Sequence, residues 1–172
     1  MKMPFILTAF FLFHMGLTFA GDRHLPPYKG SEAFESLKSL EGTWTGTHQM
    51  GEKEEPVTIE YKVSSNGSTL IETFFPGHKH EMISVYHDKD GKLSMTHYCS
   101  IGNQPELDLV STDGNAMEFS LSKQAHINVS TEGHMHGLTM TRVDNDHIVH
   151  NWTMYQKEKN GGQTTMKLAR VQ

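Results

Sequence analysis

The sequence has 172 residues, of which 36% are hydrophobic and 20% are charged, and its formal net charge is −5. This length suits one packed domain, and the acidic balance argues against a general nucleic-acid binder or a polybasic membrane binder. The single cysteine, Cys99, excludes an internal disulfide framework and a multi-cysteine zinc site. No apolar run in the middle of the chain is long enough to span a bilayer.

The N-terminus has the pattern of an export signal. Residues 1–20 begin with a basic residue, Lys2, continue with a run rich in Phe and Leu, and end with small residues at a typical cleavage spacing. We therefore expect a signal peptide and a secreted or periplasmic protein, with an uncleaved membrane anchor as the alternative. Residues 21–33 are polar and contain proline, which predicts a flexible leader, and residues 34–172 are expected to form one domain.

The rest of the chain is dominated by strand patterns. Residues 34–40 have apolar side chains at a spacing of three, which predicts one short helix. After it, apolar residues alternate with polar ones between turn signals such as Asn66–Gly67 and Asp90–Gly91. Residues 123–131 are expected to form a turn or a short helix. Strands are predicted near residues 43–49, 57–64, 69–75, 81–88, 92–99, 106–112, 116–122, 133–143, 146–156 and 164–171.

This order of elements predicts an all-β fold. Sequential strands joined by hairpin turns favour an antiparallel meander, and closure into a roughly ten-stranded barrel would remove its exposed edges. A barrel of this size can enclose a small ligand. A β-sandwich is the alternative architecture.

The start of the first predicted strand resembles a known group of barrels. Gly42 and Trp44 follow the short helix and match the Gly-x-Trp opening of the calycins, which include lipocalins, fatty-acid-binding proteins and nitrobindin-like proteins. Ten strands are more similar to the nitrobindin-like branch than to eight-stranded lipocalins. The resemblance implies structural roles for Trp44, which would close one barrel end, and for Arg170, which would pack over it. Residues 96–105 also look like a segment of bacterial secreted lipocalin-like proteins of unassigned function.

Histidine is the main chemical signal in the sequence, with twelve copies. If the more apolar parity of each strand faces the interior, five histidines point inward: His48, His97, His134, His136 and His150. Titratable groups in a core need partners. This assignment requires an odd-length turn or a bulge between the eighth and ninth strands, because a two-residue turn would pair opposite parities.

The inward histidines allow three interpretations. His134 and His136 lie two apart on one strand, so with His150 or His97 they are candidates to bind a divalent transition metal. Alternatively, His136 or His150 could ligate haem from the proximal side, which the resemblance to nitrobindin-like barrels implies. In the third interpretation no cofactor is bound, and the histidines hydrogen-bond each other and water inside a polar cavity.

Three other side chains are candidates for contact with a ligand. Glu72 alternates with Leu70 and Phe74, so it could point into the barrel as a ligand anchor, although the competing register exposes it. Asn103 and Gln104 follow the fifth predicted strand. Their amides could orient a ligand at the barrel mouth, or they could fix their own loop by bonding its backbone.

These observations predict a barrel that binds a small, partly apolar molecule without covalent chemistry. The expected polar contacts are His97, His136, His150, Glu72, Asn103 and Gln104. A haem- or metal-binding barrel is one alternative, and a small enzyme with an inward His/Glu pair is another. The sequence has no nucleophile elbow, phosphate loop or dinucleotide fingerprint, so we assign no catalytic residue. Apart from the small molecule, we expect no nucleic-acid partner and no membrane span after signal cleavage.

Overall fold

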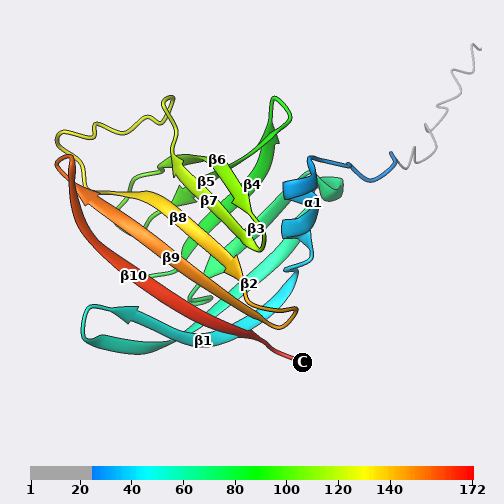
Figure 1. Ribbon diagram of the computed structural model, residues 1–172, viewed down its shortest axis with the longest axis horizontal. Helices are drawn as coiled ribbons and strands as arrows, with labels where there is room; N and C mark the ends of the chain where they lie inside the picture. The colour runs from blue at the N-terminus through cyan, green and yellow to red at the C-terminus, as the bar shows by residue number, and fades with distance from the viewer. Residues whose placement is uncertain (1–24) are drawn as a thin grey trace, which may run out of the picture.

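The computed structural model describes residues 25–172, so the predicted signal peptide and the start of the predicted leader lie outside the described residues. The chain forms a closed barrel of ten antiparallel strands with one short α-helix, α1 (Glu32–Lys38), before the first strand (Figure 1). The predicted all-β meander barrel is therefore confirmed, and the sandwich alternative is wrong. In residues 25–172 no helix is long and apolar enough to cross a membrane.

Each strand pairs with the next one along the chain, and the first pairs with the last to close the barrel. The strands are β1 (Gly42–Met50), β2 (Lys53–Ser64), β3 (Thr69–Phe74), β4 (Met82–Lys89), β5 (Lys92–Tyr98), β6 (Glu106–Asp113), β7 (Ala116–Leu121), β8 (His134–Arg142), β9 (His147–Gln156) and β10 (Lys159–Arg170). A single-turn 3₁₀ helix, η1 (Ser65–Gly67), joins β2 to β3. Residues 123–131 form turns, without a helix.

The connection between β8 and β9 has the odd length that the apolar residues of the two strands require. Arg142 pairs with Ile148, so an odd number of residues lies between these two paired positions. Met140 consequently faces the same side as His150, with both side chains buried. Further along, the register shifts between Met135 and Gly137 because a β-bulge occurs there.

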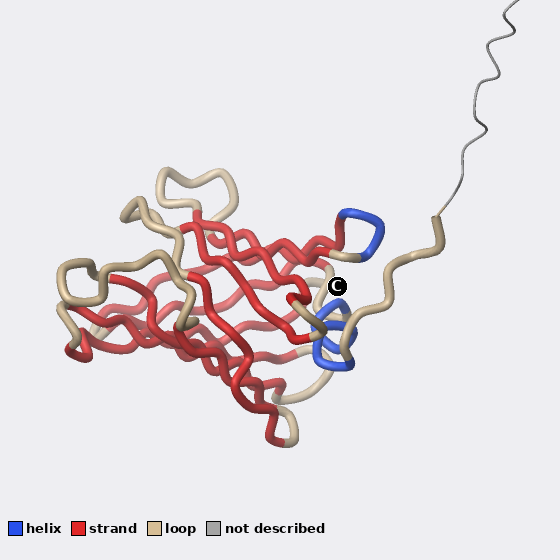
Figure 2. The backbone as a smooth tube through the Cα atoms, turned by 90° about the horizontal axis from the view of Figure 1, so that it is seen from above, coloured by secondary structure: helices blue, strands red, loops and turns tan. Residues whose placement is uncertain are grey.

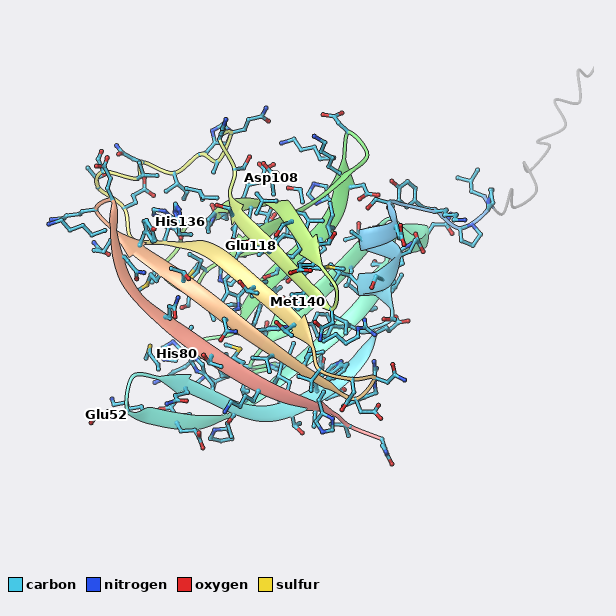
Figure 3. All side chains as sticks on the ribbon, in the orientation of Figure 1. Glu52, His80, Asp108, Glu118, His136 and Met140 are labelled. Atoms are coloured by element: carbon cyan, nitrogen blue, oxygen red, sulfur yellow. The ribbon has the colours of Figure 1, made fainter. Side chains whose placement is uncertain are left out.

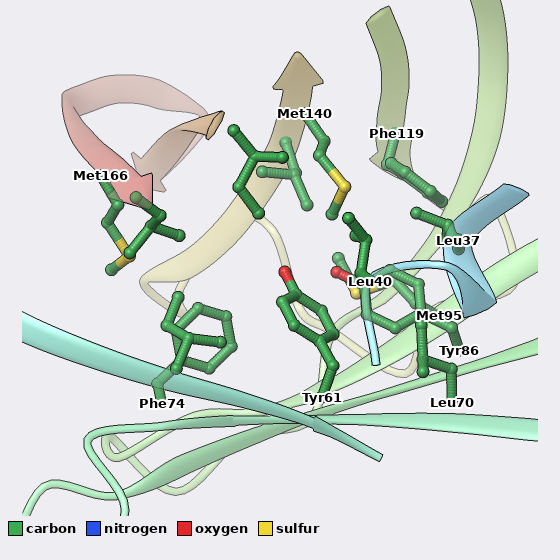
Figure 4. Close-up of a cluster of buried hydrophobic side chains, with 14 of the residues drawn as sticks. Leu37, Leu40, Tyr61, Leu70, Phe74, Tyr86, Met95, Phe119, Met140 and Met166 are labelled. Atoms are coloured by element: carbon green, nitrogen blue, oxygen red, sulfur yellow. The ribbon is translucent and has the colours of Figure 1, made fainter. Parts of the chain in front are cut away.

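Helix α1 covers one end of the barrel (Figure 2). It starts two residues earlier than its apolar spacing predicts, because the Ser31 side chain accepts a hydrogen bond from the Phe34 N–H and caps the helix. Phe34 and Leu37 are buried against the barrel core. In Figure 4, Leu37 and Leu40 lie to one side of Tyr61, and Phe74 lies to the other. The core therefore runs from the helix into the barrel interior.

Arg170 and Trp44 meet at the same end of the barrel. The guanidinium carbon of Arg170 lies 4.3 Å from the centroid of the Trp44 ring, and the indole N–H donates to the Leu40 carbonyl at 2.8 Å. Arg170 also donates to the carbonyls of Glu41 and Ser39, at 2.9 and 2.8 Å. One side chain from the last strand thus holds both the first strand and the end of the helix.

Arg170→Ala is expected to lower the free energy of unfolding by about 2 kcal/mol, because it removes a cation–π contact and two hydrogen bonds. Urea denaturation measures this change. Arg142→Ala is the matched control, since Arg142 also donates to this helix end, at Ser36 and Ser39, but stacks on no ring. Equal losses in the two variants would contradict a special role for the Arg170–Trp44 contact.

Candidate functional site

A row of polar side chains crosses four neighbouring strands inside the barrel. Tyr61 on β2 pairs with Glu72 on β3, Glu72 pairs with Ser84 on β4, and Ser84 pairs with His97 on β5. Directly paired residues point to the same face of a sheet. All four are buried, so the strand register alone brings them together in the interior. We call these four residues the polar row.

Glu72 is the centre of the polar row, and the structure selects the register that points it inward. Tyr61 donates its hydroxyl proton to Oε1 of Glu72 at 2.6 Å, and Tyr86 donates to Oε2 at 2.7 Å. Ser84 lies directly opposite Glu72 on the neighbouring strand. Burial raises the pKa of Glu72 to about 7, while the hydrogen bonds from Tyr61 and Tyr86 act in the opposite direction. Glu72 therefore exchanges a proton near neutral pH.

His150 extends the polar row across the barrel. Its Nε2 lies 3.1 Å from the Tyr61 hydroxyl oxygen. Because Tyr61 donates its own proton to Glu72, that oxygen accepts from Nε2–H. Nδ1 is then the unprotonated nitrogen; it lies 3.5 Å from Oε1 of Glu72 and has no hydrogen-bond partner. Burial lowers the pKa of His150 to about 3, so its ring is neutral at physiological pH.

His97 forms the other end of the polar row. Its Nδ1 lies 3.0 Å from Oγ of Ser84, and its ring packs against the aromatic rings of Phe74 and Trp152, with centroid distances of 5.8 and 5.0 Å. Burial lowers the pKa of His97 to about 4. For Nε2, no protein hydrogen-bond partner occurs among residues 25–172, and the side chain borders a pocket.

This pocket has a volume of about 200 Å³, and its wall includes Met50 at the end of β1 and Gly161 and Gly162 near the start of β10. The β1–β2 and β9–β10 turns lie at the barrel end opposite α1 (Figure 1). Five methionines dominate the pocket wall, and the polar contribution comes mainly from two histidines and the β10 residues. The lining residues are His48, Met50, Phe74, Met82, His97, Met135, Trp152, Met154, Gly161, Gly162, Gln163, Thr164 and Met166.

A wider groove adjoins the pocket and shares His48 and Met50 with it. Phe75 and the two loop histidines His78 and His80 also line this groove. The His48 ring packs against Phe75 with a centroid distance of 5.8 Å and hydrogen-bonds Thr164. The groove gives the pocket a contact with solvent at its His48 side.

The bulge in β8 changes the expected orientation of two histidines. On the N-terminal side of the bulge, Met135 lines the pocket. Neither His134 nor His136 lines it. His136 stacks on Tyr155 at 3.8 Å, and its Nδ1 lies 3.2 Å from Nε2 of His134. Tyr155 has the opposite parity to the pocket residue Met154. His134 is buried and His136 is half-buried, but neither contributes to the pocket wall, because one extra residue reverses the parity of the strand before Gly137 (His136 is labelled in Figure 3).

Asn103 and Gln104 make contacts that fix the β5–β6 loop. The Asn103 amide donates to the Gly133 carbonyl at 2.8 Å, which ties this loop to the segment before β8. Gln104 donates to the carbonyl of Gly102 at 3.1 Å. Neither side chain lines the pocket. Both amides thus hydrogen-bond backbone carbonyls and hold the loop in place.

The residues present do not fit a metal ion or haem. Within residues 25–172, no three His, Cys, Asp or Glu side chains are grouped so that they could hold a metal ion. The candidates His134 and His136 contact each other, whereas His150 contacts Tyr61 and Glu72. His136 and His150, the predicted haem ligands, line neither the pocket nor the adjoining groove. The buried His150–Glu72 pair, a candidate for an enzyme, does not reach the pocket wall.

The hydrogen-bond partners that stabilise Glu72 in the interior were not predicted from the sequence. Tyr61 and Tyr86 donate hydrogen bonds to this carboxyl group, and neither was predicted to do so. The methionine wall was not predicted either, although eleven methionines in 172 residues were a visible signal.

The fold and the inward polar groups define a class of protein: a closed ten-stranded antiparallel meander barrel that is compatible with a calycin-like fold. Comparison with protein-family models and with curated proteins gave no match. The finer assignment to lipocalins or to nitrobindin-like barrels thus stays a resemblance.

Proposed function

We propose that the protein binds a small, partly apolar organic molecule in the methionine-lined pocket. The observation that carries this proposal is the position of His97, a nearly buried imidazole at the wall of an otherwise largely apolar pocket. Binding sites for small molecules commonly combine apolar walls with a few polar groups that fix orientation. The mechanism is non-covalent: the methionines and aromatic rings exclude water, and His97 orients the ligand.

A second cavity, of about 240 Å³, lies under α1 and includes Met117, Met140 and Arg142 in its wall. It has no buried titratable side chain. The polar row reaches the methionine-lined pocket through His97 and does not reach the cavity under α1. We therefore place the ligand at the end of the barrel away from the helix.

The pocket volume limits the size of the ligand. Apolar cavities of about 150 Å³ take up benzene, so about 200 Å³ corresponds to a substituted single ring or a short branched chain. Methionine side chains are flexible and polarizable, so they adapt to ligands of different shape and contact aromatic rings favourably. A larger ligand would extend past His48 into the adjoining groove.

Toluene, followed by NMR chemical shifts, tests the proposal. We expect saturable binding to residues 21–172 with a dissociation constant on the order of 0.1 mM. Met154→Trp fills the pocket from a partly exposed position and is expected to abolish binding. Met117→Trp fills the cavity under α1 and is the matched control. Loss of binding in the control alone, or no binding to the native protein, would contradict the proposal.

We also propose that the ligand is met outside the cytoplasm. Support comes from the sequence of residues 1–20, with its basic start, apolar middle and small-residue end. Mass spectrometry of the protein purified from its own host tests this step. An N-terminus at residue 21 is expected, and an intact Met1 in the mature protein would contradict it.

A further inference from the structure

Two methionines of the pocket wall differ from the others in their contact with solvent. Among residues 25–172, Met50 and Met154 are the only exposed methionines, with exposed fractions of 58% and 39%. Both line the pocket. Met166 lines the same pocket but is only 3% exposed. In the part of the chain that the structure describes, solvent-exposed thioethers therefore occur only at the pocket.

The strand pairing explains this exposure. Met154 on β9 pairs with Gly162 on β10, and a glycine has no side chain that could cover the thioether. Met50 is the last residue of β1 and pairs with Thr164, two positions further along β10. Paired residues share a face of the sheet, and so do residues two positions apart on one strand. Because β10 lies between β1 and β9, the two methionines flank one short stretch of β10.

We propose that Met50 and Met154 form a site of reversible oxidation that controls the affinity of the pocket. The oxidant is a peroxide, of which hydrogen peroxide is the simplest. The thioether sulfur attacks one peroxide oxygen, an S–O bond forms, the O–O bond breaks, and the second oxygen leaves as water. The sulfur is oxidised to a sulfoxide and the peroxide is reduced. Methionine sulfoxide reductases reverse the change, with thiols as the reductant and water as the other product.

The effect on binding rests on the proposed function, because it concerns the occupant of the same pocket. A thioether is apolar and polarizable, so it contacts an apolar ligand favourably. A sulfoxide is polar, and a ligand that displaces water from its oxygen offers no hydrogen bond in return. Oxidation at two positions of the wall is therefore expected to weaken toluene binding about tenfold.

Peptide mass spectrometry of the native protein in dilute hydrogen peroxide tests the site directly. Met50 and Met154 are each expected to gain one oxygen atom about tenfold faster than Met82 and Met135, which line the same pocket but are half-buried. Met95 has no exposed surface and provides the slow internal reference. Similar rates for the exposed and the half-buried methionines would overturn the proposal.

Toluene titrations before and after peroxide treatment measure the effect on the pocket, with each protein compared only with its own untreated form. The native protein is expected to lose about tenfold in affinity and to recover it after incubation with a methionine sulfoxide reductase and a thiol. Met50→Leu/Met154→Leu is expected to show no change on treatment, because leucine has no sulfur to oxidise. Met117→Leu is the matched control, since Met117 lines the cavity under α1, and it is expected to respond as the native protein does.

The outcomes separate this inference from the proposed function. If the untreated native protein does not bind toluene, the proposed function fails, and the order of oxidation alone decides whether Met50 and Met154 form the site. If toluene binds and its affinity is unchanged although both sulfurs carry oxygen, the proposed function holds and the inference is overturned. An equal loss of affinity in Met50→Leu/Met154→Leu would also overturn it. The oxidation rates of the native protein need no variant, so they test the site even if the double variant does not fold.

Discussion

Glu72→Gln is expected to gain stability relative to the native protein as the pH rises, by about 3 kcal/mol in total between pH 4.5 and the region above pH 7. The folded protein holds a proton on Glu72 up to a pKa of about 7, whereas the unfolded chain releases it near 4.5. In this interval the native state binds more protons than the unfolded state, so a rise in pH favours unfolding. Glutamine has no proton to release and retains an acceptor for the tyrosines.

Urea denaturation of both proteins at several pH values between 4.5 and 8.5 measures the difference in the free energy of unfolding. Glu60→Gln is the matched control, since Glu60 lies exposed on the neighbouring strand β2. Its difference from the native protein is expected to stay flat. A flat difference for Glu72→Gln as well would mean that the buried carboxyl group has an ordinary pKa and that the polar row does not have the packing described.

The barrel was predictable from the sequence because its signals are local and repeated. Alternating apolar residues and positive-φ turn residues recur along the chain, as at Asp90 and Gly91, and each hairpin depends only on adjacent segments. The contact of Arg170 with Trp44 joins distant positions, yet the resemblance to the calycins implied it. The odd-length connection between β8 and β9 was predictable too, since Met140 and His150 require the same face.

The site was less predictable because it depends on register between strands and on a bulge. A one-residue shift moves every side chain of a strand to the opposite face, so the two registers of Glu72 could not be separated without its partners Tyr61 and Tyr86. The bulge near His136 has no strong sequence signal other than Gly137. Because of this bulge, Met135 lines the pocket, whereas His134 and His136 do not. The alternation of inward and outward side chains therefore cannot be followed through a bulge. In this protein the bulge lies next to Met135, which lines the pocket.

His150→Gln is expected to lose less stability than the native protein when the pH is lowered, with a difference of about 2 kcal/mol between pH 6.5 and pH 5. The unfolded chain binds a proton on His150 below 6.5, whereas the folded protein does not bind it until about pH 3. Acid therefore favours the unfolded native sequence. Glutamine does not titrate, and its amide N–H can still donate to the Tyr61 oxygen.

His126→Gln is the control for this comparison, because His126 is exposed in the β7–β8 loop. The same urea measurements apply, and an equal response of the two histidine variants to acid would contradict the buried, neutral state of His150.

His150 and Glu72 have opposite effects on the same transition. The two side chains lie 3.5 Å apart and both contact the Tyr61 hydroxyl, yet acid removes stability through His150 and adds stability through Glu72. Between pH 4.5 and 6.5 their effects largely cancel in the native protein, so its own pH profile would conceal both. The double variant Glu72→Gln/His150→Gln is therefore expected to have a profile close to that of the native protein, while each single variant departs from it in the opposite sense. Two single-variant profiles that depart in the same sense would show that burial does not shift the two pKa values in opposite directions.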